Sequence, residues 1–322
     1  MIRKAFAIVL AALLGASCLA AQSTEPPPAP ADRSDQVLRQ APERGKLTAV
    51  FFKLSLDEES SEDEKSGDST LLISPDGKTM LVDGGSPRCQ DQVLGYLEAL
   101  GIRSLDIVLA THPHVDHIGG LAGVLGSLPV GRLYMSELVY PTGPYAALVG
   151  AARKAGVEIR TLEEGDRFSF GGSVAVQVFN PEPNIAYYEG YPSNSTQFIN
   201  NRSLVLKFVY GEASMLFMGD LYSPREAELL EKYGAALAAD VLKMGHHGSD
   251  TSSSKSFIKT VNPQVAAAMH DRLASLQVYK NLRKLGAKVF ITAIDGCVRI
   301  SAGPEGVWTT LTQFERASDF LN

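Results

Sequence analysis

The pattern of apolar and polar positions predicts many short strands with helices between them. Apolar runs bounded by turn residues indicate strands, and apolar residues spaced three or four apart indicate helices. The predicted strands are residues 47–56, 70–74, 79–82, 105–110, 133–140, 174–179, 203–209, 214–218, 240–244, 265–269, 288–293 and 298–301. The predicted helices are residues 91–100, 145–155, 225–233, 254–260 and 276–285. This order is typical of a mixed α/β protein with more strand pairing than a doubly wound sheet.

The N-terminus carries the one membrane-like stretch of the sequence. Residues 5–16 are apolar, but a spanning helix needs about 20 such residues. Basic Arg3 and Lys4 precede the stretch and small residues follow it, so residues 1–21 are predicted to be a signal peptide. A lipoprotein signal with a lipid anchor at Cys18 stays open as the second route. Both routes place the protein outside the cytoplasm, periplasmic or secreted, without a transmembrane domain.

The rest of the chain is predicted to form one domain behind a linker. Residues 22–46 are rich in Pro and Ala, as linkers are, and residues 47–322 contain no similar break. The acidic run 57–68 is predicted to be a solvated loop. Two further cysteines, Cys89 and Cys297, could pair in an oxidising compartment, and the sequence leaves that disulfide open.

Composition narrows the range of functions. The chain of 322 residues is 45% hydrophobic and 20% charged, which is typical of a globular protein, and its net charge of −6 excludes a strongly basic nucleic-acid binder. Basic residues nevertheless outnumber acidic residues eight to two between positions 243 and 288. That local excess could receive a phosphate-bearing substrate.

Five of the six histidines lie in two short motifs, and three of them follow the predicted strand 105–110 in His112-Pro113-His114-Val115-Asp116-His117. Alternate residues of an extended loop point the same way, so His112, His114 and Asp116 share a side, and a turn brings His117 round. Imidazole and carboxylate groups are ligands for Zn²⁺ and Mn²⁺. Four such groups within six residues predict a site for two adjacent metal ions.

Further ligands are expected at the ends of two later strands. Asp220 follows the predicted strand 214–218 and is a candidate for a carboxylate that bridges two metals. The pair His246-His247 follows the predicted strand 240–244. Because adjacent residues project in different directions, one histidine of the pair is predicted to bind metal and the other to face substrate.

These motifs resemble those of the metallo-β-lactamase superfamily, which folds as a four-layer αββα sandwich with metals at the sheet edge. The first motif matches its His-x-His-x-Asp-His signature, and Asp220 matches its bridging acid. Val82-Asp83-Gly84-Gly85 matches an Asp-Gly-Gly turn, in which Asp83 would support a metal-binding histidine from behind. The resemblance predicts this α/β fold for the chain.

A closer resemblance is to the extracellular hydrolase domain of competence DNA-uptake proteins of the ComEC type. The matching segments span residues 47–301 in order: Gly67-Asp68-Ser69, Pro75-Asp76-Gly77, Asn200-Asn201-Arg202-Ser203-Leu204-Val205-Leu206, Leu242-Lys243-Met244-Gly245-His246-His247-Gly248-Ser249 and Asp295-Gly296-Cys297-Val298. One departure is that no histidine lies between His117 and His246, the interval from which the lactamases take a third histidine. Asn200 or Asn201 lies roughly at that place.

The resemblance implies a role for each candidate residue. His112 and His114 would hold one metal, Asp116 and His117 the other, and Asp220 would bridge them. His246 is assigned to the second metal and His247, with Asp116, to catalysis, although the two histidines could exchange roles. Substrate would be oriented by Asn201, Arg202, Lys243 and Ser249. The expected cofactors are two divalent ions, Zn²⁺ or Mn²⁺, one weakly held because an amide is a poor Zn²⁺ ligand.

The reaction implied is hydrolysis by a metal-activated water. The first candidate substrates are phosphodiesters, either DNA, which would make the protein a nuclease, or a phosphodiester of the cell envelope. A lactonase or β-lactamase-like activity is the alternative enzyme, disfavoured by the missing histidine. A non-catalytic metal- or DNA-binding partner of an uptake system is the alternative outside enzymes.

Overall fold

A computed structural model of the protein describes residues 31–39, 43–57, 64–184 and 195–316. The predicted signal peptide, Cys18 and much of the predicted linker lie outside the described residues. Within the described ranges, no helix combines the length and the apolar character that crossing a membrane requires.

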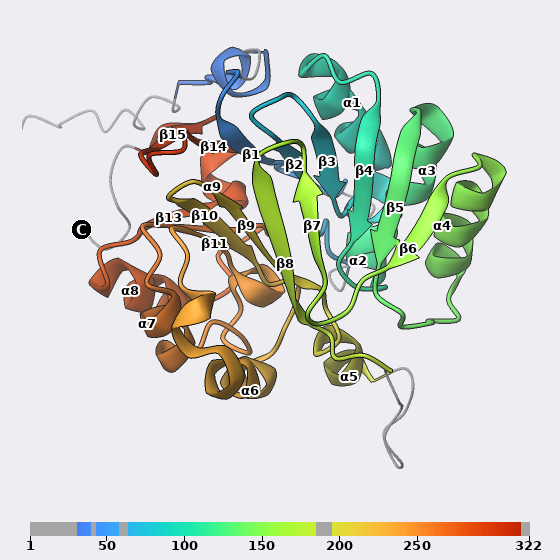
Figure 1. The fold of residues 1–322 in the computed structure, drawn as a ribbon. Helices are drawn as coiled ribbons and strands as arrows, with labels where there is room; N and C mark the ends of the chain where they lie inside the picture. The colour runs from blue at the N-terminus through green and yellow to red at the C-terminus, as the bar shows by residue number, and fades with distance from the viewer. Residues whose placement is uncertain (1–30, 40–42, 58–63, 185–194, 317–322) are drawn as a thin grey trace, which may run out of the picture.

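The described strands form two sheets (Figure 1). The first sheet has the order β15 (Trp308–Thr312), β14 (Val298–Ala302), β1 (Leu47–Phe51), β2 (Thr70–Ile73), β3 (Thr79–Val82), β4 (Leu105–Ala110), β5 (Val130–Met135) and β6 (Glu158–Thr161). The second has the order β13 (Lys288–Ile291), β12 (Val265–Ala268), β11 (Val241–Lys243), β10 (Ala213–Phe217), β9 (Val205–Tyr210), β8 (Val174–Asn180) and β7 (Arg167–Phe170). Neighbouring strands are parallel from β3 to β6 and from β10 to β13.

Helices cover the outer face of each sheet. The described helices are α1 (Gln90–Ala99), α2 (Val115–Ile118), α3 (Leu121–Ser127), α4 (Gly143–Lys154), α5 (Thr196–Asn200), α6 (Ser223–Tyr233), α7 (Lys255–Val261), α8 (Leu276–Lys284) and α9 (Thr292–Asp295). One apolar cluster joins α1, α3 and α4 to the first sheet, and another joins α6, α7 and α8 to the second. Figure 1 shows these two groups of helices on opposite sides of the molecule.

A third apolar cluster fills the space between the sheets. Phe51 of β1 and Phe217 of β10 stack across it with their ring centroids 6.0 Å apart. All five residues of β1 are buried because this strand packs against helices on one face and against the other sheet on its opposite face. The layers are therefore helix, sheet, sheet and helix, which confirms the predicted αββα sandwich.

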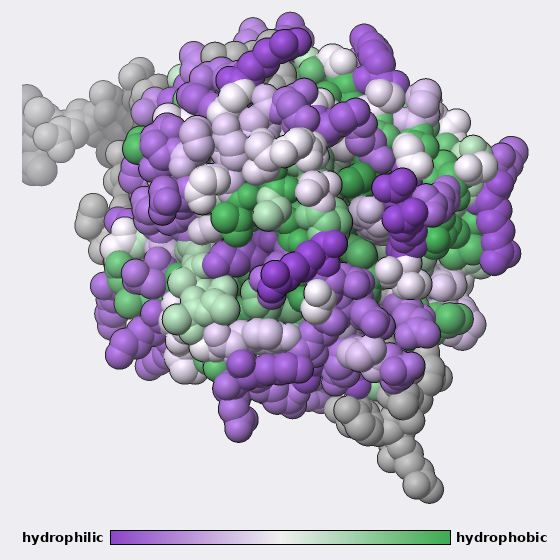
Figure 2. All heavy atoms as spheres, viewed as in Figure 1, coloured by the Kyte–Doolittle hydropathy of each residue, from purple (hydrophilic) through white to green (hydrophobic). Residues whose placement is uncertain are grey.

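The unpredicted strands lie at the edges of the sheets. These are the strands β6, β7 and β15, and β6 is largely exposed. Figure 2 shows the surface on this side of the molecule, where hydrophobic patches are small and are separated by hydrophilic residues. Strand β5 begins and ends earlier than the predicted strand 133–140.

The two cysteines of the domain are both free and buried. Cys89 lies just before α1 and Cys297 just before β14, and both belong to the cluster beneath the helices of the first sheet. The structure therefore contains no disulfide between Cys89 and Cys297, the pairing that the sequence left open.

Candidate metal centre

The motif residues meet at one edge of both sheets. Asp83 follows β3, His112–His117 follow β4, Asp220 follows β10, and His246-His247 follow β11. Strands β3 and β4 are parallel, and so are β10 and β11. Their carboxyl ends therefore lie at the same edges, and packing of the two sheets brings those edges together.

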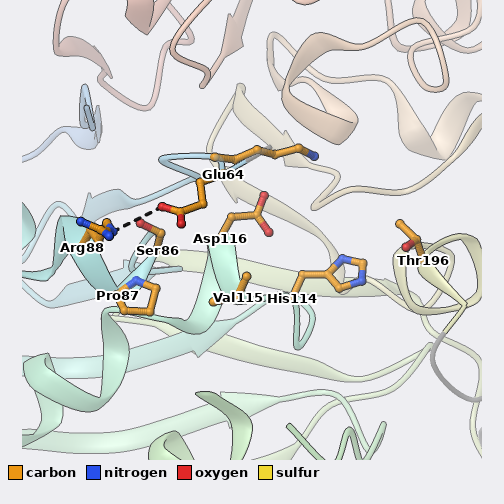
Figure 3. Close-up of a pocket in the computed structure, with 9 residues that line it drawn as sticks. Glu64, Ser86, Pro87, Arg88, His114, Val115, Asp116 and Thr196 are labelled. Carbon is orange, nitrogen blue, oxygen red and sulfur yellow. Dashed lines mark ion pairs between the residues drawn. The ribbon is translucent and has the colours of Figure 1, made fainter. Parts of the chain in front are cut away.

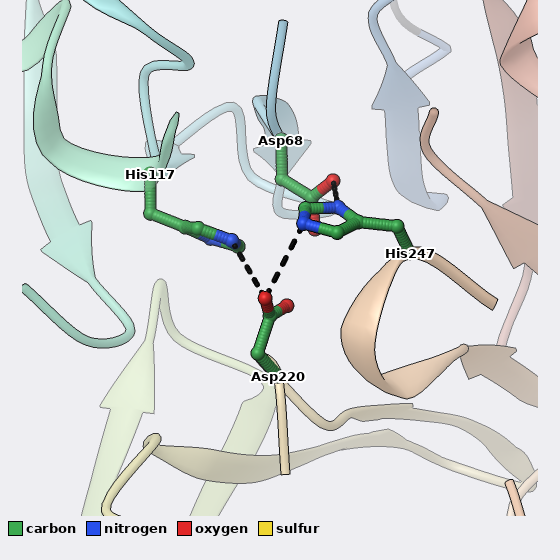
Figure 4. A group of neighbouring side chains, drawn as sticks. All are labelled: Asp68, His117, Asp220 and His247. Atoms are coloured by element: carbon green, nitrogen blue, oxygen red, sulfur yellow. Dashed lines mark hydrogen bonds and ion pairs between the residues drawn. The ribbon is translucent and has the colours of Figure 1, made fainter. Parts of the chain in front are cut away.

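Asp220 lies at the centre of the cluster. Its Oδ2 atom is 3.3 Å from Nε2 of His117 and 3.3 Å from Nε2 of His247. With Asp68, these side chains offer ligand atoms that all lie within 4.8 Å of one another. Figure 4 shows both imidazoles pointing at the Asp220 carboxylate, with Asp68 beside His247.

Further side chains of the two motifs gather around the Asp220 carboxylate. His112 Nε2 lies 3.0 Å from His114 Nδ1 and 3.9 Å from Asp220 Oδ2. Asp116 Oδ2 is 3.2 Å from Nε2 of His247. The fold therefore brings together residues of both motifs around one carboxylate.

The two adjacent histidines occupy different places. His247 is buried against Asp116 and Asp220, whereas His246 is half-buried, with Nε2 4.0 Å from Asp220 Oδ2 and Nδ1 2.6 Å from the Thr251 hydroxyl. Both residues have positive φ angles, 44° and 57°, a conformation that side chains with a Cβ rarely adopt. The geometry thus favours His247 as the ligand, the reverse of the preferred sequence assignment.

Carboxylates behind two histidines fix the orientation of their rings. Asp83 Oδ2 lies 2.8 Å from His117 Nδ1, and Asp83 also accepts hydrogen bonds from the backbone and hydroxyl of Thr111. Asp68 Oδ1 lies 2.9 Å from His247 Nδ1. Because each Nδ1 is engaged by a carboxylate, each Nε2 is left with its lone pair directed at the cluster, as metal binding requires.

Asp68 was missed by the sequence interpretation, which placed it in a solvated acidic loop. It is 2% exposed, because the strand pairing of β2 with β3 sets the start of β2 beside the end of β3. Its backbone N–H also donates to the carbonyl of Asp116. The segment Gly67-Asp68-Ser69 was the available signal, since it stands directly before a strand.

Lys243 differs from the prediction that it orients substrate. It is 3% exposed, and its ammonium pairs with the Asp68 carboxylate and donates to the carbonyl of Gly219. A buried carboxylate needs a compensating charge. Lys243 supplies that charge behind His247 and does not face the pocket.

The other predicted substrate residues have partners of their own. Arg202 is buried and pairs with Glu182 at 2.7 Å, and Asn201 Oδ1 accepts a hydrogen bond from the backbone of Tyr222. Ser249 Oγ contacts Thr251 at the rim, beside His246. Of these three, only Ser249 lies in the loop that carries the half-buried histidine.

The electrostatics of the cluster match a site for cations. Burial alone would lower the pKa of His117, but the carboxylates of Asp220 and Asp83 outweigh burial and raise that pKa to about 10. Two atoms that face the cluster, His117 Nε2 and Asp220 Oδ1, form no hydrogen bond within the described part of the chain. Divalent ions would satisfy these atoms and replace the protons that the histidines otherwise hold, so the residues present fit such ions.

A pocket of about 540 Å³ opens beside the cluster (Figure 3). His114, Asp116 and Thr196 line one part of it, and Figure 3 shows the His114 ring extending toward Thr196. Lys65 and Arg88 line the pocket as well, and Arg88 is paired with Glu64. The pocket thus places two basic side chains around the same space as His114 and Asp116.

Comparisons with known proteins agree with this geometry. Residues 63–186 match the metallo-beta-lactamase superfamily. Competence protein ComA of Neisseria gonorrhoeae is 28% identical over 244 residues, which cover 74% of this chain and 31% of that protein. ComE operon protein 3 of Bacillus subtilis is 32% identical over 174 residues, covering 54% of this chain and 21% of that protein.

A shorter similarity is to a ribonuclease. Ribonuclease Z of Clostridium kluyveri is 32% identical over 84 residues, covering 26% of each protein. The chain thus spans less than a third of the length of each of these three relatives. Together with the αββα layers, the matches show that this chain contains a metallo-beta-lactamase superfamily domain with relatives among the competence proteins.

Proposed function

We propose that the protein is a metal-dependent hydrolase of phosphodiesters that acts outside the cytoplasm. The observation that carries the proposal is that Nε2 atoms of three histidines, His112, His117 and His247, lie 3.3–3.9 Å from one oxygen of the Asp220 carboxylate. His112, His114 and Asp220 would hold one divalent ion, and Asp116, His117, His247 and Asp220 would hold the other. When bound, two such ions supply a nucleophilic hydroxide at neutral pH and stabilise negative charge on a phosphoryl group.

The chain's own residues orient that chemistry. Asp83 and Asp68 hold the rings of His117 and His247 by their Nδ1 atoms, and Lys243 balances the charge of Asp68. Burial lowers the pKa of His246 to about 4, so its ring is neutral at pH 7. With Nδ1 against the Thr251 hydroxyl, we assign the substrate-facing role to His246.

The pocket favours an anionic substrate. Lys65 lines the pocket together with His114 and Asp116 of the ligand cluster. A phosphodiester bound beside His114 would therefore lie within the field of Lys65. The name of Ribonuclease Z supports phosphodiester chemistry, and the competence relatives support DNA as the first substrate to test.

The extracytoplasmic location is part of the same proposal. The sequence of residues 1–21 supports it, through its basic start, apolar middle and small residues. DNA from the surroundings or a phosphodiester of the cell envelope would be accessible to a protein in the periplasm, with or without a lipid anchor at Cys18.

The test is hydrolysis of bis(p-nitrophenyl) phosphate, single-stranded DNA and nitrocefin by the full chain with Mn²⁺ or Zn²⁺. We expect metal-dependent cleavage of the phosphodiesters, with kcat reduced at least about 100-fold by Asp220→Asn because several kcal/mol of charge stabilisation is lost. Asp240→Asn is the matched control, since Asp240 also accepts partly buried hydrogen bonds, from the backbone and hydroxyl of Ser214. Asp240 directly precedes β11, at the end of that strand opposite to His246 and His247.

Other results would select the alternatives. Turnover of nitrocefin without turnover of either phosphodiester would contradict the proposal and favour the lactamase-like enzyme. Retention of metal with no turnover of any substrate would favour the non-catalytic binding protein.

A further inference from the structure

The side chain of Asn200, at the end of α5, is buried without a hydrogen-bond partner. The residue is 1% exposed, and neither Oδ1 nor Nδ2 forms a hydrogen bond within the described ranges. Buried polar groups nearly always have a partner, because an unsatisfied one costs the free energy of its desolvation. His117 Nε2 and Asp220 Oδ1, both in the ligand cluster, are unsatisfied in the same way.

The position of α5 places Asn200 beside the ligand cluster. Thr196 and Asn200 are four residues apart and share one face of the helix, and Thr196 lines the pocket together with His114. The carbonyl of Asn200 accepts a hydrogen bond from the backbone of Ser203, whose hydroxyl in turn accepts one from the backbone of Asp220. The helix therefore ends between the pocket and the Asp220 loop.

We propose that Asn200 Oδ1 is a ligand of the divalent ion that His112 and His114 hold. The assignment rests on the metal centre of the proposed function, but it does not depend on which bond is hydrolysed. An amide oxygen is a hard ligand, which suits Mn²⁺ better than Zn²⁺. With Asn200 in this role, the position held by His112 and His114 prefers Mn²⁺, and the position that contains His117 and His247 accepts either ion.

The neighbouring amide supplies a matched control. Asn201 is half-buried, and its Oδ1 already accepts a hydrogen bond from the backbone of Tyr222. A substitution at position 200 thus removes an amide that has no hydrogen-bond partner within the described ranges. The same substitution at position 201 removes an amide whose oxygen already has one.

The experiment is titration of the metal-free full chain with Mn²⁺, with the free ion measured by electron paramagnetic resonance. We expect the wild-type chain and Asn201→Leu to bind two ions. In Asn200→Leu one of the two is expected to bind at least about 10-fold more weakly, since even loss of a partner behind a ligand costs about 10–100-fold. Asn200→Asp, which keeps an oxygen at the same place, should bind two ions, and Asn200→His should shift the preference of that position from Mn²⁺ to Zn²⁺.

Thermal unfolding of the metal-free variants separates a metal role from a structural one. Leu matches Asn in size and removes the unsatisfied amide, so Asn200→Leu should unfold at or above the wild-type temperature without metal. A lower unfolding temperature, or two Mn²⁺ ions bound by Asn200→Leu as tightly as by wild type, would overturn the assignment and leave the proposed hydrolysis standing. A wild-type chain that binds no Mn²⁺ or Zn²⁺ would overturn the assignment and the proposed function together.

Discussion

At the scale of the residue, the candidate metal centre depends on two carboxylates that hold histidine rings in place. Asp83 and Asp68 each engage the Nδ1 atom of one histidine, His117 and His247 respectively. An imidazole can donate a lone pair from only one nitrogen while the other carries a proton, so these contacts select the tautomer that binds metal. We therefore expect the two carboxylates to strengthen metal binding by orienting these rings.

Asp83→Asn tests this role. Asn tolerates the positive φ of 58° at this position, so the fold should persist while the charge behind His117 is lost. We expect metal affinity to fall about 10–100-fold, measured by competition with a chromophoric chelator. Asp240→Asn serves again as the control, and equal affinities in Asp83→Asn and wild type would contradict the role.

The local motifs were predictable from sequence because their ligands are neighbours in the chain. His112, His114, Asp116 and His117 needed only the geometry of one loop. Asp68 could not be found in this way, because its burial depends on pairing between β2 and β3 and on the approach of Lys243 from the other sheet. The choice of His247 over His246 depends on two left-handed backbone conformations, which the residue types do not reveal.

At the scale of the element, two loops, one before β2 and one after β3, pack against the histidine loop. The backbone of Asp68 donates to the carbonyl of Asp116, and the backbone of Gly84 donates to the carbonyl of His117. Gly67 makes the first contact possible, since it has φ +81° and a Cβ added there would lie 1.6 Å from the Asp116 carbonyl oxygen. The loop before β2 can approach the histidine loop only without that atom.

Gly67→Ala should therefore damage both stability and metal binding. The left-handed conformation alone costs about 1–2 kcal/mol with a Cβ, and displacement of Asp116 should weaken metal binding as well. Gly77→Ala is the control, because Gly77 has φ +89° but open space around its Cβ position. Urea unfolding should show a loss in both variants, and metal affinity should fall only in Gly67→Ala; an equal affinity in the two would contradict the steric account.

Elements were predictable where both faces of a strand are buried. Such strands are mostly apolar in sequence, as are β1 and the stretch Ile107–Ala110 of β4. The edge strand β6 has the largely exposed sequence Glu-Ile-Arg-Thr. Because it pairs with β5 without burying its side chains, its sequence shows no apolar run from which a strand could be predicted. Strands β7 and β15 were missed for the same reason, since each has one buried residue, whereas the edge strand β13 was predicted because Val289 and Ile291 are apolar and buried.

At the scale of the whole molecule, the sandwich sets the site between two halves of the chain. The first sheet supplies His112, His114, Asp116 and His117, and the second supplies Asp220 and His247. The apolar layer between the sheets, with Phe51 stacked on Phe217, fixes their separation. The positions of the candidate ligands relative to one another therefore depend on how the two sheets pack. The sequence motifs could predict this arrangement only because their resemblance to a known family also indicated the fold.

X-ray diffraction from crystals grown with Mn²⁺, at a wavelength where Mn scatters anomalously, would locate bound ions directly. We expect two anomalous peaks next to the Asp220 carboxylate, one beside His112 and His114 and the other beside His117 and His247. Absence of any peak within this cluster, with Mn²⁺ present in the crystal, would contradict the metal centre and the hydrolysis proposed for it.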